Sequence, residues 1–172
     1  MEEVVLVDEQ DNEIGTEEKL KAHMDGGKLH RALSVFIFSS DGKMLLQKRA
    51  DGKYHAGGLW TNACCTHPRP GESPEDAAHR RLQEEMGFDC PLEKVFTTVY
   101  GADVGGGLTE KEFDHVFFGT FDNNPKPNPE EVGDFKWIGM KELLDDVKKN
   151  PDKYTPWFRV LLPQLNDKYT QE

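Results

Sequence analysis

The sequence predicts an α/β (α+β) fold in which a mixed β-sheet packs between helices. Two observations favour this class. Short apolar runs typical of strands are joined by hairpin-type turns, and segments with helical spacing are interleaved with them along the chain. This order is typical of a sheet that is covered by helices. The length of 172 residues suits a single domain with one core.

The first part of the chain contains strand signals and one short helical segment. Val4–Val7 is an apolar run followed by the turn cluster DEQDN, which predicts a strand. Glu17–His23 has helical spacing and ends before an Asp-Gly-Gly turn. Residues 33–50 predict two strands around Asp41-Gly42, a dipeptide that favours hairpins. Leu59–Cys65 is expected to be extended.

The helix that begins after Ser73 has the clearest boundaries. Ser73 can cap its amino end, and Pro74 suits the first helical position. Apolar side chains then recur every four residues until Gly87, a residue that commonly ends helices. We therefore expect a helix of about three turns here.

The remaining segments alternate between strands and helices. Lys94–Tyr100 and Glu110–Phe121 predict two strands that are joined by the flexible sequence VGGGL. Phe135–Ile138 predicts another strand, and Lys141–Lys149 and Pro156–Tyr169 predict helices. The interleaved order supports a sheet between helical layers.

Charge and composition exclude several classes of function. A formal net charge of −11 disfavours nucleic-acid partners and anionic membranes. No apolar run reaches the roughly 18 residues that a membrane span needs. Three cysteines cannot all pair, and the acidic start MEEVV does not resemble a secretory signal, so we expect a cytoplasmic protein. Bound metals and a few basic residues can still favour a phosphate ester locally.

The predicted helix after Ser73 carries a group of charged residues. Arg81, Glu84 and Glu85 are three and four residues apart and can share one helical face. Paired carboxylates on such a face can bind Mg²⁺, which often bridges to a substrate phosphate. The alternative is a solvated face with ordinary Arg–Glu ion pairs, which are common on helices.

The wider spacing around this helix resembles the Nudix box, G-x5-E-x7-R-E-U-x-E-E-x-G-U. The residues in register are Glu72, Arg80, Leu82, Glu84, Glu85, Gly87 and Phe88. Thr66 replaces the first glycine, and Arg81 replaces the glutamate after the arginine. In Nudix hydrolases that glutamate usually helps to collect the metals that activate water. The resemblance therefore implies a helix that holds a diphosphate but lacks one part needed for hydrolysis, since an arginine binds phosphate oxygens instead.

A thiol and an imidazole lie upstream of that helix. In an extended segment Cys65 and His67 face the same side and Cys64 faces the other. This selects Cys65 for chemistry and Cys64 for the core. A thiol with an ordinary pKa of about 8.5 is mostly protonated at neutral pH and can donate a proton. The alternative is that both cysteines are buried and structural.

A second group of polar residues is compatible with a metal site. Glu110 and Glu112 are two apart on a predicted strand and face one way. Imidazole and carboxylate ligands together suit Zn, Mn or Fe. The histidines that can join the carboxylates are His23, His30 and His67. Each of them alone can equally be an ordinary core or surface residue. The other histidines are expected to be structural: His55, His79 and His115.

The chain also resembles the family of type I isopentenyl-diphosphate isomerases, Nudix-fold enzymes that do not hydrolyse their diphosphate. The resemblance extends from Lys19 to Trp157 through the segments EEKLKAH, LHRALSVF, QKRADGKYH, WTNACCTHP, TEKEF and TPWF. The family often has Pro-Gly where this chain has Gly57-Gly58, and the loop Gly105–Gly107 carries unusually few side chains. Neither departure removes a chemical group.

The resemblance implies a reaction and a set of roles. The enzyme would interconvert isopentenyl diphosphate and dimethylallyl diphosphate through a carbocation, in isoprenoid biosynthesis. The implied catalytic residues are Cys65, Glu112, Tyr100 and Trp157. The implied residues for the allylic or homoallylic diphosphate are Lys19, Arg49, Lys53 and Arg81. Without the family, Trp157 would be assigned to core packing and Tyr100 to a half-buried strand position.

The same resemblance implies two metal ions. A divalent metal, Mn²⁺ or Zn²⁺, would bind His23, His30, His67, Glu110 and Glu112. Mg²⁺ would lie near Glu85 and the diphosphate. We expect one domain over residues 1–172, with an N-terminal extension (about 1–30) that contributes to the site, in a monomer or weak homodimer.

Two other functions remain open from the sequence. The first is a Nudix hydrolase of a nucleoside diphosphate derivative, which leaves Arg81, Cys65 and Trp157 without roles. The second is a non-catalytic Nudix domain that binds a metal or ligand as a regulator.

Overall fold

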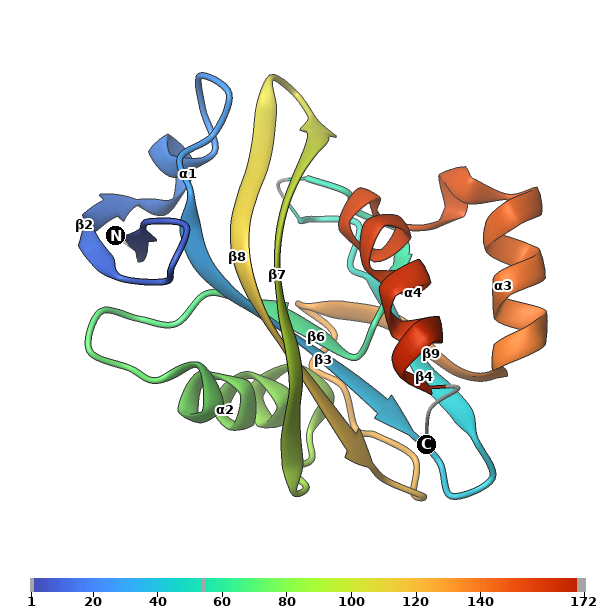
Figure 1. Cartoon of the computed structure of the whole chain (residues 1–172). Helices are drawn as coiled ribbons and strands as arrows, with labels where there is room; N and C mark the ends of the chain where they lie inside the picture. The colour runs from blue at the N-terminus through green and yellow to red at the C-terminus, as the bar shows by residue number, and fades with distance from the viewer. Residues whose placement is uncertain (1, 54, 170–172) are drawn as a thin grey trace.

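The structure, a computed structural model, describes residues 2–53 and 55–169, and its centre is a mixed β-sheet (Figure 1). Strand β3 (His30–Phe38) lies in the middle of this sheet. It pairs in parallel with β8 (Leu108–Thr120) and antiparallel with the short β6 (Cys64–Thr66). The predicted mixed sheet is therefore confirmed.

The predicted hairpin over residues 33–50 has its turn but not its pairing. Strand β3 and strand β4 (Lys43–Arg49) share a single register pair, Phe38 with Met44, and then diverge. Beyond it, β4 pairs with β9 (Val132–Gly139) and β5 (Trp60–Thr61). Both diverging strands are largely buried, so each needs a hydrogen-bonding partner along its whole length. Their divergence lets β5 and β6, and with them Cys65, enter between β3 and β4.

The N-terminal segment forms a hairpin and a short helix beside β3. Strand β1 (Glu3–Val7) pairs with β2 (Glu13–Glu18), and α1 (Lys19–Ala22) follows at once. Strand β2 was not predicted, because its sequence EIGTEE is polar and largely solvent-facing. Its extended conformation is stabilised by hydrogen bonds to β1, which the sequence of β2 alone does not indicate.

A long hairpin forms the other side of the sheet. Strand β7 (Leu92–Gly105) runs antiparallel to β8, and the two extend further than the sequence predicted. The expected flexible loop is a tight turn instead. Gly105, Gly106 and Gly107 adopt φ values of 87°, 63° and 77°, which residues with a Cβ rarely adopt. Glycine therefore closes the hairpin rather than loosening it.

Helices cover the sheet on its two faces, as predicted (Figure 1). Helix α2 (Pro74–Met86) packs on one face. Helix α4 (Pro156–Tyr169) packs on the other, together with α3 (Met140–Lys149) and the short 3-10 helix Pro151–Lys153 that joins them. None of the helices in the described part of the chain is long and apolar enough to cross a membrane.

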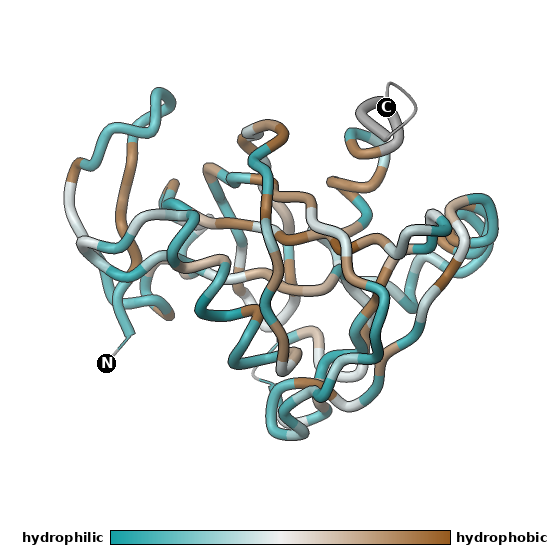
Figure 2. The backbone as a smooth tube through the Cα atoms, turned by 90° about the horizontal axis from the view of Figure 1, so that it is seen from below, coloured by the Kyte–Doolittle hydropathy of each residue, from teal (hydrophilic) through white to brown (hydrophobic). Residues whose placement is uncertain are grey.

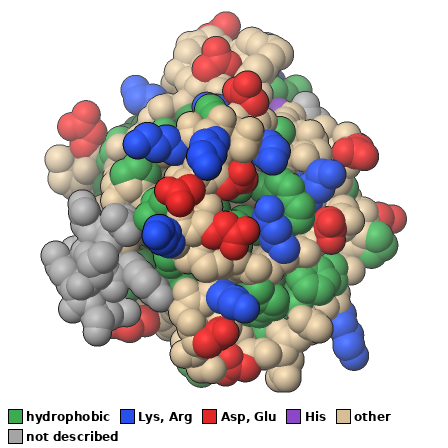
Figure 3. Space-filling view, turned by 90° about the vertical axis from the view of Figure 1, so that its right-hand side faces the viewer, with side chains coloured by type: hydrophobic (Ala, Val, Ile, Leu, Met, Phe, Trp, Pro, Cys, Tyr) green, Lys and Arg blue, Asp and Glu red, His purple; other side chains and the backbone are tan. Residues whose placement is uncertain are grey.

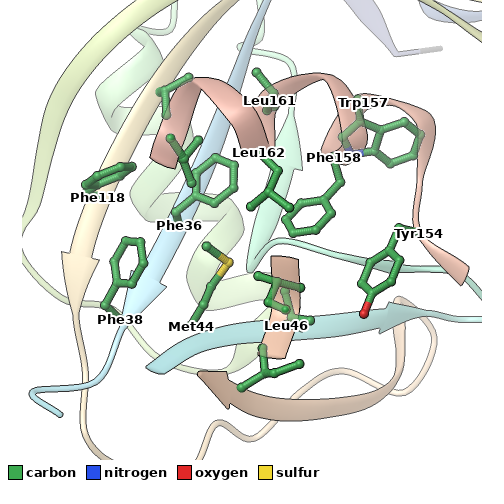
Figure 4. Close-up of a cluster of buried hydrophobic side chains, with 14 of the residues drawn as sticks. Phe36, Phe38, Met44, Leu46, Phe118, Tyr154, Trp157, Phe158, Leu161 and Leu162 are labelled. Atoms are coloured by element: carbon green, nitrogen blue, oxygen red, sulfur yellow. The ribbon is translucent and has the colours of Figure 1, made fainter. Parts of the chain in front are cut away.

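The side chains of β3 alternate between the two cores. Leu33, Val35 and Ile37 join the cluster under α2, while Phe36 and Phe38 join the cluster under α4 (Figure 4). The strands at the centre are accordingly the most apolar part of the backbone trace, and polar residues gather in the loops (Figure 2). On the face in Figure 3, acidic and basic side chains are interspersed.

Helix α2 has the predicted boundaries. The Asp76 N–H donates to Ser73 Oγ over 3.1 Å at its start, and Gly87 ends it with φ 72°. A Cβ at Gly87 would lie 2.1 Å from the carbonyl oxygen of Lys126, so the helix end packs directly on another backbone segment. This contact fixes α2 against the chain that leads into β9.

We expect Gly87→Ala to destabilise the fold far more than Gly71→Ala. Both glycines have left-handed φ values, 72° and 82°, so both substitutions cost about 1 kcal/mol in backbone strain. Only Gly87 has a backbone within clashing distance, which adds roughly 2 kcal/mol or more. Urea unfolding measures both losses. Equal losses in the two variants would contradict the packing at Gly87.

Candidate active site

A cavity of about 260 Å³ opens where α2, β6, the β7–β8 hairpin and the start of α4 meet. Carboxylates, imidazoles and the Cys65 side chain line it together with basic side chains. The cavity thus joins an acid–base site to a site for anions.

Strand register brings several of these groups together. Glu110 and Glu112 are two apart on β8, and both side chains are about 5% exposed. In the parallel pairing with β3, Glu112 lies opposite His30. In the antiparallel pairing with β7, Glu112 lies opposite Tyr100, whose hydroxyl donates to Glu112 Oε2 over 2.6 Å. Glu112 therefore sits at the crossing of two strand pairings.

Two of the histidines have their tautomer set by the backbone. His23 Nδ1 is 2.6 Å from the Lys19 carbonyl oxygen, and His30 Nδ1 is 2.7 Å from that of Lys28. A carbonyl oxygen only accepts, so each Nδ1 carries the proton and each Nε2 keeps its lone pair. Both Nε2 atoms are buried without a hydrogen-bond partner among the described residues. A backbone-held imidazole with a free lone pair is the usual form of a metal ligand.

The ligand atoms of four predicted metal-binding residues form one buried cluster. They lie within 4.8 Å of one another and belong to His23, His30, His67 and Glu112. Glu110 lies beside this cluster, with its Oε1 3.8 Å from His23 Nε2. Three nitrogens and a carboxylate suit a divalent transition metal. The unpartnered Nε2 atoms of His23 and His30 offer lone pairs that can coordinate such an ion. The residues present therefore fit a divalent metal.

Burial controls the charge states around the cluster. Burial lowers the pKa of His67 to about 4, so this imidazole is neutral at pH 7. Burial opposes ionisation of Glu112, but the hydrogen bond with His67 Nε2 at 2.9 Å outweighs it and holds the pKa of Glu112 well below its usual range. Burial and the charge of Glu112 raise the pKa of Glu110 well above its usual range. The two carboxyls therefore differ in charge although they are neighbours.

Cys65 lies on β6 and lines the same cavity as Glu112. Its Sγ is 3.1 Å from Asn62 Oδ1 and 3.5 Å from Ser34 Oγ. Burial raises the pKa of the Cys65 thiol well above its usual range, so the sulfur keeps its proton at neutral pH. Cys64 points the other way into the core under α2. The structure thus separates the two neighbours as the period of a strand predicts.

Several of the cations around the cavity are paired with carboxylates. Arg81 contacts Glu85 Oε1 at 2.6 Å and Glu84 Oε2 at 2.7 Å. Lys53 contacts Glu131 Oε2 at 2.5 Å, and Arg81 is 3.5 Å from the same atom. The other basic residues predicted to bind substrate also line the cavity: Lys19, which pairs with Glu2 at 3.4 Å, and Arg49. All four predicted cations therefore face one cavity.

Some charged residues of helix α2 hold the preceding loop in place, and others lie at the cavity. Arg80 binds Glu72 through two bonds of 2.8 Å, which fasten the preceding loop to the helix. Glu85 is 7% exposed and accepts from Gln47 Nε2 over 3.0 Å as well as from Arg81. The predicted shared face is present, and its Arg–Glu pairs lie at the cavity rather than only in solvent.

Trp157 serves both the core and the cavity. Its side chain is 2% exposed and belongs to the hydrophobic cluster under α4 (Figure 4). It also lines the cavity. The Arg49 guanidinium lies 5.1 Å from the centroid of its ring. An anion held by Arg49 would therefore lie close to the indole.

The structure adds residues to the site that sequence reasoning did not select. His55 was expected to be structural, but its ring lines the cavity, 5.6 Å from the Trp157 ring, and its Nε2 is 3.6 Å from Glu110 Oε1. Gln47 and Glu131 contact the predicted residues as described above. Spacing carries no signal for these three, because they come from separate strands and loops. His79 and His115 pair with Asp89 and Asp11 and do not line the cavity within the described chain.

Comparisons with known proteins agree on fold and family. A family model described as NUDIX domain matches residues 28–158. Isopentenyl-diphosphate Delta-isomerase 2 of Aromatoleum aromaticum is 52% identical over 164 residues, which cover 95% of this chain and 86% of that protein. Isopentenyl-diphosphate Delta-isomerase of Serratia proteamaculans is 50% identical over 164 residues, which cover 95% and 91%.

Solved structures of low sequence identity share the fold. The crystal structure of DR0079 from Deinococcus radiodurans matches with a TM-score of 0.80 at 18% identity, covering 95% of this chain and 98% of that chain. The MutT protein from Methanosarcina mazei Go1 matches with a TM-score of 0.67 at 17% identity, covering 82% and 95%. The Nudix fold, predicted from the helix after Ser73, is thus confirmed.

The metal-free protein should lose stability as the pH falls from about 6.5 towards 4, partly through His67. The unfolded chain binds a proton to this imidazole below about 6.5, whereas the folded state does so only near 4. Protonation therefore favours unfolding, by on the order of 2–3 kcal/mol near pH 4.5. Urea unfolding in chelator at pH 7 and pH 4.5 measures this, and His67→Gln should reduce the difference. An unchanged difference would contradict a buried neutral imidazole.

Proposed function

The chain belongs to the isopentenyl-diphosphate Delta-isomerases of the Nudix fold, and on that premise we propose that Cys65 and Glu112 are its acid–base pair. The enzyme interconverts isopentenyl diphosphate and dimethylallyl diphosphate in isoprenoid biosynthesis. The observation that carries the proposal is that Cys65, Glu112 and Trp157 line one small cavity.

The reaction needs one proton donor and one proton acceptor on a small hydrocarbon. The terminal alkene carbon takes a proton and becomes part of a tertiary carbocation. A proton then leaves the carbon nearer the oxygen, and the double bond forms there. Burial keeps Cys65 as a thiol, and the hydrogen bond with His67 keeps Glu112 ionised. Because the reaction is reversible, each group donates in one direction and accepts in the other.

The carbocation needs stabilisation that does not trap it. The Trp157 indole can provide this through a cation–π contact worth about 2 kcal/mol when desolvated. Tyr100 donates to Glu112 over 2.6 Å and holds this carboxylate in place. Enclosure by buried side chains keeps water from capturing the cation.

The basic residues hold the diphosphate away from the reacting carbons. Arg49, Lys53 and Arg81 bind its oxygens, with Lys19 at the edge of the cavity. Arg49 lies beside Trp157, so a diphosphate on Arg49 places the hydrocarbon next to the indole. Binding energy from the diphosphate then orients the alkene.

The proposal includes two metal ions. His23, His30, His67, Glu110 and Glu112 would hold a divalent ion, Mn²⁺ or Zn²⁺, and Glu85 would hold Mg²⁺ with the diphosphate. Bound Mg²⁺ neutralises phosphate charge, and the other ion fixes the orientation of the carboxylates. The buried lone pairs of His23 and His30 support the first assignment.

The site disfavours the two alternatives. A cavity of about 260 Å³ is small for a nucleoside diphosphate derivative, and Arg81 stands where hydrolysis uses a carboxylate. A purely regulatory domain would need no thiol beside Glu112. We also propose that residues 1–172 form one domain, to which the extension 1–30 contributes Lys19, His23 and His30. It would act in the cytoplasm as a monomer or weak homodimer; residues 1, 54 and 170–172 of this range lie outside the described residues.

Cys65→Ala and Glu112→Gln should each abolish isomerisation and retain binding of inorganic pyrophosphate. Removing either partner removes a proton transfer worth on the order of 10²–10⁴ in rate. Proton NMR of the enzyme with isopentenyl diphosphate and Mg²⁺ in deuterated water reports isomerisation, exchange and hydrolysis together. Cys90→Ala, away from the cavity, is the matched control and should stay active. Full activity in either test variant would exclude the assigned pair, and phosphate release would favour a hydrolase.

Glu131→Gln should bind inorganic pyrophosphate several-fold more tightly, while Lys53→Gln should bind it more weakly. The Glu131 carboxylate pairs with Lys53 and lies 3.5 Å from Arg81, so it competes with an incoming anion. Titration calorimetry in chelator, at fixed ionic strength, measures the affinities. Glu93→Gln, an exposed residue on β7, is the control. Weaker binding by Glu131→Gln would show that this carboxylate supports the anion instead.

A further inference from the structure

A chain of buried hydrogen bonds joins the Cys65 thiol to the start of helix α4. Its members are Asn62, Thr61 and Thr155, which are at most 2% exposed. Within the described chain, these three residues are not among those that line the cavity. They therefore lie behind the site and do not reach a ligand in the cavity.

The backbone fixes the orientation of the Asn62 amide. Its Nδ2 donates to the carbonyl oxygens of Val35 over 3.0 Å and Cys64 over 2.9 Å. Carbonyl oxygens only accept, so the amide cannot be flipped without losing both bonds. Its Oδ1 must therefore face Cys65, and the thiol donates to it over 3.1 Å. The other acceptor near the sulfur, Ser34 Oγ, is more distant at 3.5 Å.

The hydroxyls behind Asn62 have a fixed direction as well. The backbone N–H of Phe158 donates to Thr155 Oγ1 over 3.4 Å. Thr155 Oγ1 donates to Thr61 Oγ1 over 3.0 Å, and Thr61 Oγ1 donates to Asn62 Oδ1 over 2.9 Å. Asn62 Oδ1 can only accept, so Thr61 spends its single hydroxyl proton there and must itself accept from Thr155. Every bond from α4 to Asn62 therefore points the same way. The Asn62 oxygen thus accepts from Thr61 and from the thiol.

This chain reaches the helix turn that carries the indole. Trp157 stands between Thr155 and Phe158, at the edge of the aromatic cluster next to Tyr154 and Phe158 (Figure 4). The N–H of Thr155 also donates to the Trp60 carbonyl oxygen over 3.0 Å, which ties the start of α4 to β5. The thiol and the indole are therefore connected through one rigid, buried path.

We propose that Asn62 is a positioning residue that orients the Cys65 thiol. Thr61 and Thr155 fix the position of Asn62 relative to helix α4, which carries Trp157. The inference rests on the proposed roles of Cys65 and Trp157. The proton must pass between a fixed sulfur and a carbon whose cation faces a fixed indole. An error of about 1 Å in such an arrangement can cost on the order of 10²-fold in rate.

Three variants test this arrangement. Asn62→Ala removes the acceptor, Thr61→Val breaks the chain with little change of shape, and Thr61→Ser keeps the hydroxyl. We expect kcat to fall by roughly 10- to 100-fold in Asn62→Ala and by roughly tenfold in Thr61→Val. KM should change by less than about twofold, because neither residue lines the cavity. Thr61→Ser should keep most of kcat, and Thr97→Val, at an exposed position of β7, is the matched control.

The infrared S–H stretch of Cys65 provides a readout that does not depend on turnover. The band is assigned by its loss in Cys65→Ala. It should move to higher wavenumber in Asn62→Ala, where the thiol loses its acceptor. It should move to lower wavenumber in Thr61→Val, where the thiol becomes the remaining donor to Asn62 Oδ1.

The outcomes separate the two proposals. Folded Asn62→Ala with normal kcat and an unshifted band would overturn the role of Asn62. If Asn62→Ala does not fold, equal kcat in Thr61→Val and Thr61→Ser would overturn the coupling to α4. Activity in Cys65→Ala would remove the acid–base pair, whereas the shifted bands would still report the hydrogen bond itself.

Discussion

The parallel pairing of β3 with β8 is the constraint on which the site depends. It places His30 beside Glu112 and keeps both side chains buried. Side chains alternate along a strand, so a slip of one residue would turn Glu110 and Glu112 away from the imidazoles. The apolar residues of β3, which fill one core or the other at every second position, make such a slip costly. The packing of the fold and the geometry of its chemistry are therefore set by the same register.

The site places polar side chains in buried positions, where water does not reach them. His23 and His30 are fully buried, and each uses one nitrogen to satisfy a backbone carbonyl. The other nitrogen is left to an external ligand, which costs stability while it is unpartnered. Glu112 is held by an imidazole and a phenol. The fold thus loses some stability at these buried polar groups, and in return the groups are already arranged for the reaction.

Some local features were predicted correctly from the sequence, but the pairing of strands was not. The helix predicted over Glu17–His23 is shorter, Lys19–Ala22, because Glu17 and Glu18 pair with β1 as part of β2. The boundaries of α2 depend on Ser73 and Gly87, which act within one helical turn, and the sides of Cys64 and Cys65 follow from strand alternation. The hairpin over 33–50 has its turn, but whether β4 pairs with β3 or β9 is decided by the whole sheet. His55 escaped notice because only folding brings it to Trp157. The roles of individual residues come from family resemblance and geometry together, since spacing alone cannot join segments so far apart.

The distance along the chain between His30 and Glu112 also bears on how the protein is made. Contacts between remote residues form slowly, because the intervening chain must be ordered first. During synthesis on the ribosome, β3 emerges long before β8, so His30 is present before Glu112 has been exposed. A growing chain therefore cannot complete the cluster of His23, His30, His67 and Glu112 until residue 112 has left the exit tunnel. Binding of a divalent metal by this cluster would therefore be a late event, after most of the sheet has formed.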